Sequence, residues 1–86
     1  MFTVKVLRED ESGRDCMSYY EATSVDVYPS GVDRDGLQTN LPCIEFTVAS
    51  GDRTFLVVGA AGDYIPKAVF VENSSGKTTD VIRAPK

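Results

Sequence analysis

Histidine and tryptophan are both absent from this sequence. Histidine is the side chain whose ordinary pKa lies nearest neutrality, so its absence excludes catalytic triads, histidine-ligated metals and imidazole acid–base catalysis within the chain. The two cysteines, Cys16 and Cys43, cannot complete a four-ligand zinc site without carboxylates or a second chain. Neither cysteine adjoins a basic cluster that would lower its pKa. We therefore predict a protein that is not an enzyme and that holds no metal or cofactor.

Long apolar runs and clusters of basic residues are also lacking. No apolar run approaches the roughly 18 to 20 residues of a membrane span, and the N-terminus has no signal-like apolar block. We expect a complete, cytoplasmic chain with no membrane contact and with two free thiols. The nine basic residues are scattered among thirteen acids, which gives a net charge of −4. This balance disfavours a nucleic-acid partner, because such proteins cluster Lys and Arg against phosphates.

The composition that remains is typical of a small folded protein. With 86 residues, 42% hydrophobic and 26% charged, the chain has the size of one domain, which we place at residues 1–86. A domain of this length buries only about 60 to 65% of the surface that its unfolded chain exposes. We therefore expect modest stability.

Residues 43–58, CIEFTVASGDRTFLVV, have the pattern of a β-hairpin. In the first arm Ile44, Phe46 and Val48 alternate with Glu45 and Thr47, which predicts one buried face and one wet face. The second arm, residues 54–58, is apolar without interruption, so we expect it to be the most central strand, covered on both faces. Residues 49–53 supply the turn.

Four more segments have strand character: residues 2–7, 17–28, 68–72 and 78–83. Within residues 17–28 the inward parity changes between Ala22 and Val25, which predicts a bulge near Thr23 and Ser24. A break into two strands is the competing interpretation. No segment has a strong helical period, although residues 59–67 are compatible with a single helical turn. The predicted fold is all-β, a small antiparallel barrel or two-layer sandwich of about six strands.

The longest irregular connection, residues 29–42, begins and ends with proline. Connections of this length in small domains are often functional. Asp33 and Asp35 resemble part of a calcium loop, but Arg34 separates them and no glutamate occupies the last ligand position. A solvated loop explains them better.

The tyrosines give the leading candidate for a binding surface. Tyr19 and Tyr20 are neighbours in a predicted strand, so they must point to opposite faces, and one of them is expected to be exposed. The phenylalanines Phe2, Phe46, Phe55 and Phe70 are predicted to be core. With the loop aspartates, the interaction residues we predict are Tyr19, Tyr28, Asp33, Asp35 and Tyr64. The alternative is that the tyrosines straddle core and water.

Two glycine-containing segments offer an anion site. The alternative binding site that we predict is an anion site formed by the backbone of Gly59 and Gly62 with Lys67 or Lys77, although a tight turn explains these glycines equally well. Gly76-Lys77-Thr78 resembles the end of a P-loop, but that motif needs a glycine where Val71 stands and a helix afterwards. A hairpin turn is the simpler interpretation.

These observations favour a non-catalytic β-rich module that binds a protein partner or associates with itself. Small acidic chains without a catalytic site are typical of phage and mobile-element accessory proteins, so this class fits the composition. The alternatives are a binder of a small anionic ligand and an acidic inhibitor or decoy that acts on a basic partner.

Overall fold

A computed structural model describes residues 1–28, 41–59 and 65–84. These residues form six strands in one antiparallel sheet of order β4-β3-β2-β1-β5-β6, which confirms the predicted all-β class. The strands are β1 (Phe2–Glu9), β2 (Asp15–Tyr28), β3 (Cys43–Val48), β4 (Arg53–Val57), β5 (Ile65–Glu72) and β6 (Thr78–Arg83). The described residues include no helix, and hence none that could cross a membrane. The helical turn considered for residues 59–67 falls partly on residues 60–64, which lie outside the described residues, while β5 already begins at Ile65.

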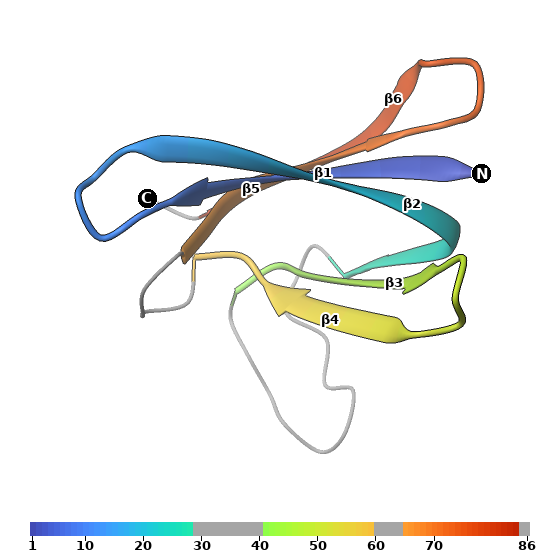
Figure 1. The fold of residues 1–86 in the computed structure, drawn as a ribbon, viewed down its shortest axis with the longest axis horizontal. Helices are drawn as coiled ribbons and strands as arrows, with labels where there is room; N and C mark the ends of the chain where they lie inside the picture. Colours follow the sequence, from blue (N-terminus) through green and yellow to red (C-terminus); the bar gives the residue numbers. More distant parts are fainter. Residues whose placement is uncertain (29–40, 60–64, 85–86) are drawn as a thin grey trace.

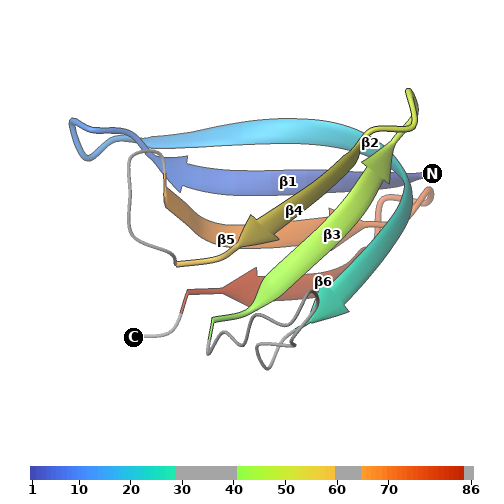
Figure 2. The same cartoon turned by 90° about the horizontal axis from the view of Figure 1, so that it is seen from below.

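The sheet folds over on itself without closing. Figures 1 and 2 show β3 and β4 lying as one layer against a second layer of β1, β5 and β6, with the long β2 curving from one layer into the other. The arrangement is thus two layers made from a single open sheet, and β4 and β6 are its edges among the described strands.

Strand β2 makes this curve through a bulge, as predicted. Ala22 pairs with Val48 and Ser24 pairs with Thr47, so Thr23 is the extra residue. The Thr23 hydroxyl donates to the carbonyl oxygen of Thr47 at 3.2 Å. After the bulge Val25 and Val27 pack against the core, as Ala22 does before it. The alternative of two separate strands is wrong, since β2 is continuous over its 14 residues.

The core lies between the two layers. Val4 and Val6 of β1 and Ile44 and Phe46 of β3 are almost fully buried there. The ring centroid of Phe46 lies 5.2 Å from that of Tyr20. Buried residues from five strands and the turn after β4 complete the cluster: Val4, Val6, Ala22, Ile44, Phe46, Val58, Val69, Val71 and Ile82. The period-2 pattern of the sequence therefore identified the buried face of these strands correctly.

Two predictions about the central hairpin need correction. Its pairing is as expected, but β4 is an edge strand rather than the most central one, and Phe55 is 41% exposed. On the supposedly wet face of β3, Glu45 is buried, and Arg53 Nη2 lies 3.3 Å from its Oε1. The apolar run of β4 therefore does not mean that both faces of the strand are covered. The carboxylate of Glu45, which the alternation predicted to be exposed, is buried and is compensated by its ion pair with Arg53.

Three hairpin turns share one local structure. In each, a five-residue segment has Ser-Gly at its third and fourth positions; the segments are residues 10–14, 48–52 and 73–77. The first N–H donates to the fifth carbonyl oxygen, and the glycine N–H donates to the first carbonyl oxygen, at 2.9–3.0 Å. Gly13, Gly51 and Gly76 have φ of 85°, 96° and 82°. This is the left-handed conformation that a three-residue hairpin loop requires at this position.

The first and third turns are further fixed by a side chain. Asp10 Oδ1 accepts from the N–H and hydroxyl of Ser12 and from the N–H of Arg14. Asn73 Oδ1 accepts from the matching groups of Ser75 and Lys77. The P-loop-like Gly76-Lys77-Thr78 therefore belongs to a hairpin turn, and β6 follows it directly.

Candidate functional site

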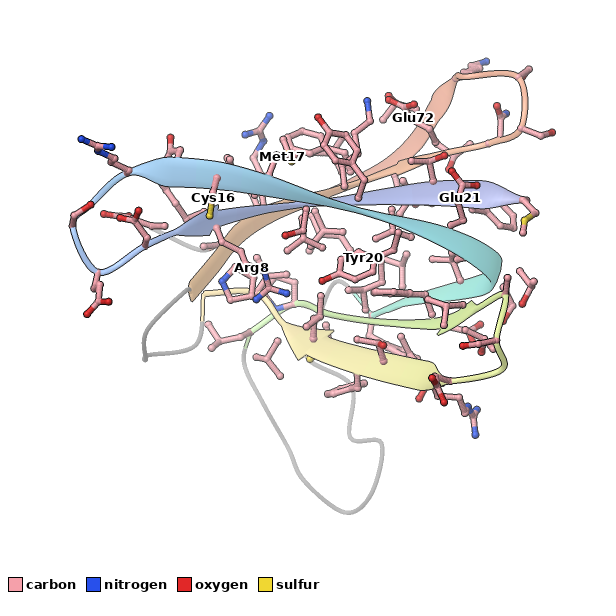
Figure 3. All side chains as sticks on the ribbon, in the orientation of Figure 1. Arg8, Cys16, Met17, Tyr20, Glu21 and Glu72 are labelled. Atoms are coloured by element: carbon pink, nitrogen blue, oxygen red, sulfur yellow. The ribbon has the colours of Figure 1, made fainter. Side chains whose placement is uncertain are left out.

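The outer face of one layer displays a group of large apolar side chains. We call Leu7, Met17, Tyr19, Phe70 and Val81 the outer-face patch. Figure 3 shows Met17 on the same side of the sheet as Glu21 and Glu72, whereas Tyr20 and Arg8 point to the opposite, core-facing side. The patch draws on β1, β2, β5 and β6.

Strand register brings these residues together. Tyr19 lies opposite Lys5, Lys5 lies opposite Phe70, and Phe70 lies opposite Val81, which makes one row across four strands. Met17 and Leu7 are opposite each other in the next row. Directly opposed residues of antiparallel strands have Cβ atoms about 4.5 to 5.5 Å apart. The members of the patch therefore lie on one sheet face around Lys5, although they come from four separate segments of sequence.

Several of these side chains are unusually open to solvent. Tyr19 is 65% exposed, Val81 48% and Met17 38%. Leu7 and Phe70 are partly buried between them. Scattered exposed apolar residues need no explanation, but a contiguous group of them on one sheet face is the kind of surface that marks an interaction site.

The cations of this face are held by neighbours. Lys5 Nζ lies 2.6 Å from Glu72 Oε2 and 5.9 Å from the centroid of the Tyr19 ring. The hydrogen bond to Glu72 raises the pKa of Lys5. The Arg83 guanidinium lies 5.7 Å from the centroid of the Phe70 ring. Each cation thus contacts an aromatic face, and one of them also pairs with a carboxylate, so the patch combines apolar area with compensated charge.

Of the five predicted interaction residues, the structure describes two, Tyr19 and Tyr28. Tyr19 belongs to the patch and Tyr20 to the core side, as the opposite-face argument required. Tyr28, half-buried, ends β2 nine residues farther on, beyond the bulge at Thr23 and in the part of β2 that has passed into the other layer (Figure 1). The structure therefore does not bring Tyr19 and Tyr28 together. Asp33, Asp35 and Tyr64 lie outside the described residues.

Sequence reasoning missed most of the patch. Phe70 and Phe55 were predicted to be core, but Phe70 faces outward because Val69 and Val71, on either side of it, face the core. Parity within β5 carries this signal, yet its apolar run Ala68-Val69-Phe70-Val71 conceals it. The contributions of Met17 and Val81 depend on which strands are neighbours, and the sequence does not encode that directly.

The groups that we predicted to bind an anion either already have hydrogen-bond or ion-pair partners or lie far apart from one another. The Gly59 N–H donates to the Pro66 carbonyl oxygen at 2.8 Å. Lys67 Nζ lies 3.0 Å from Asp15 Oδ1 and 3.6 Å from Glu9 Oε2. The hydrogen bond to Asp15 raises the pKa of Lys67. Lys77 follows the other end of β5, about 17 Å or more from Lys67 at the rise of a strand. Gly62 lies outside the described residues.

The two cysteines differ in their exposure to solvent. Both thiols are free, as predicted; Cys16 is exposed and Cys43 is buried. Burial raises the pKa of Cys43, which disfavours its thiolate. Within residues 1–28, 41–59 and 65–84, no three His, Cys, Asp or Glu side chains gather as a metal site would require.

Comparison with known proteins adds no identity. No family model, curated protein or solved structure matches this chain.

Proposed function

We propose that this chain is a non-catalytic protein-binding module whose outer-face patch contacts a protein partner. The single observation that supports it is the outer-face patch, in which Tyr19, Met17 and Val81 are exposed on one sheet face. Aromatic and methionine side chains are enriched in the cores of protein interfaces. Tyrosine is also among the residues that most often dominate binding energy.

The surroundings of the patch fit the same function. Glu21 and Glu72 flank the apolar row, and Thr3 donates to Glu21 at 3.4 Å. A charged margin around an apolar centre is the usual anatomy of such interfaces. We place the module in the cytoplasm, as an accessory or assembly protein of the phage or mobile-element kind, on the strength of its acidic composition without histidine.

A photo-crosslinking experiment tests this proposal. Tyr19 is replaced by the photoreactive benzoylphenylalanine, and irradiation in an extract of the native host is expected to give a discrete adduct with one protein. The matched control places the same group at Glu11, an exposed residue of the β1–β2 turn outside the patch.

Competition gives the second measurement. Excess unmodified protein is expected to suppress the adduct, whereas the Tyr19→Ala, Val81→Ala double variant is expected not to suppress it. Equal labelling from positions 19 and 11, or equal competition by the double variant, would show that the patch is not the contact surface.

A further inference from the structure

Edge strand β4 has the composition of an interior strand. After Arg53 its residues are Thr54, Phe55, Leu56 and Val57, with no proline and no further charge. β4 pairs with β3 in unbroken register, and no strand among the described residues lies on its other side. Apolar edge strands without such interruptions are templates for pairing with another chain.

The other edge shows the contrast within the same chain. On β6, Asp80 lies opposite the buried Val71 and therefore points to the core-facing side, and a register shift separates Val71 from Glu72 in the pairing with β5. Inward-pointing charges and bulges are two of the devices by which proteins block edge-to-edge association. β6 has both devices and β4 has neither.

We propose that β4 pairs antiparallel with β4 of a second copy of this chain, about a two-fold axis at Phe55. In this register Phe55 lies opposite Phe55 of the second copy, Thr54 opposite its Leu56, and Arg53 opposite its Val57. Opposed residues then share a face, as antiparallel pairing requires. The two exposed phenylalanines form a cross-strand aromatic pair.

The chemistry of β4 favours a second copy over an unrelated strand. A two-fold contact must be self-complementary, and in this register no like charges meet, because Arg53, the one charged residue of β4, faces a valine. Leu56, already packed against the core, would extend that core across the junction. The chain as a whole carries −4, so a contact free of acids is where two copies meet with least repulsion.

This dimer is separate from the proposed partner surface. The outer-face patch lies on β1, β2, β5 and β6, and β4 contributes nothing to it. Loss of the dimer would therefore leave the partner proposal standing, and the reverse also holds. Val81→Lys changes the patch and serves as the matched control.

Sedimentation of the purified protein over a wide concentration range gives the first test. The wild type and Val81→Lys are expected to reach the mass of two chains, and Phe55→Lys and Phe55→Glu to remain monomeric. Mixing the two Phe55 variants is expected to restore the double mass, because opposite charges then meet at the two-fold axis. A wild type that stays monomeric at its highest concentration, or a Phe55→Lys variant that dimerises as the wild type does, would overturn the proposal.

A disulfide test does not depend on how the charged variants fold. In a Cys16→Ser background, Phe55→Cys is expected to form an intermolecular disulfide, because directly opposed antiparallel residues have Cα atoms about 4.5 to 5.5 Å apart, within disulfide range. Thr79→Cys on β6 is the control, expected to remain reduced. Equal crosslinking at both positions, or none at position 55, would contradict the register.

Discussion

The structural role of Asp10 is not evident from the composition of the segment around it. It lies in the acidic run Glu9-Asp10-Glu11, which resembles a solvated loop, yet its carboxylate accepts three hydrogen bonds that fix the β1–β2 turn. The bond from the Ser12 hydroxyl, followed by that from the Arg14 N–H, lowers the pKa of Asp10 from its ordinary 3.8. A group whose pKa is lowered on folding stabilises the fold above its unfolded pKa, and that stabilisation is lost as pH falls through the folded pKa.

Asparagine at position 10 should keep the structure of the turn, because Asn73 accepts the same backbone hydrogen bonds in the β5–β6 turn. We expect Asp10→Asn to keep most of the stability at neutral pH and to lose less of it on acidification below about 3.8 than the wild type does. Asp10→Ala should lose the turn contacts at every pH. Urea unfolding at a series of pH values measures this. Identical acid sensitivity in the wild type and Asp10→Asn would contradict the assignment.

Gly51 tests the backbone of the central turn. Its φ is 96°, and an added Cβ would meet no atom within 4 Å, so any cost of substitution is conformational rather than steric. We expect Gly51→Ala to destabilise the protein by about 1 to 2 kcal/mol, and Gly51→Asn by less, because asparagine visits this conformation more readily. Chemical denaturation of the two variants gives the comparison. Equal losses of stability in the two variants would show that the left-handed conformation of Gly51 is not the source of the cost.

At the scale of elements, the bulge of β2 is the feature that lets one strand serve both layers. Thr23 is the single extra residue, and it returns Val25 and Val27 to the core-facing side. Because side chains alternate with period two, the same sequence in a regular strand without the bulge would turn Val25 outward and Asp26 inward.

Deletion of Thr23 removes the extra residue, so Ala22 and Ser24 become regular neighbours opposite Val48 and Thr47, and Val25 keeps facing the core. This variant is therefore expected to fold but to be less stable than the wild type, because β2 loses the bulge through which it curves between the layers. Thr23→Ala keeps the residue count and loses only the hydrogen bond to the Thr47 carbonyl, which is worth about 0.5 to 1.5 kcal/mol. Circular dichroism and thermal unfolding distinguish the two. A deletion variant as stable as Thr23→Ala would show that the curve of β2 does not depend on the bulge.

At the scale of the whole molecule, the phenylalanines show where the interior lies. Phe46 is buried between the layers, whereas Phe55 is 41% exposed on the edge strand. We expect Phe46→Ala to cost about 3 to 5 kcal/mol, as large-to-small changes in a core do. Phe55→Ala should cost about 1 kcal/mol, the span of strand propensities, when measured on dilute protein. Equal losses on denaturant unfolding would contradict the edge position of β4.

The two proposed contacts also belong to this scale, because the contact through β4 depends on the sheet being open and the outer-face patch depends on the strand order. A closed barrel would leave β4 no free edge, and a different strand order would scatter Tyr19, Phe70 and Val81 over separate surfaces. Joined through β4, two copies would present two outer-face patches on one assembly.

The sequence by itself determined the strands, the hairpins, the bulge at Thr23 and Ser24, and the opposite facing of Tyr19 and Tyr20. Each of these follows from alternation along one strand or from turn residues a few positions apart, and such local rules act before any distant contact forms. Only the tertiary structure decided that β4 is an edge, that Phe70 faces outward and that Met17 lies in one patch with Val81. Strand order depends on the pairing of β1 with β5. This pairing is made by backbone N–H and C=O groups, which every residue except proline carries alike. Side-chain patterns therefore indicate which side of a strand is buried but not which strands are its neighbours.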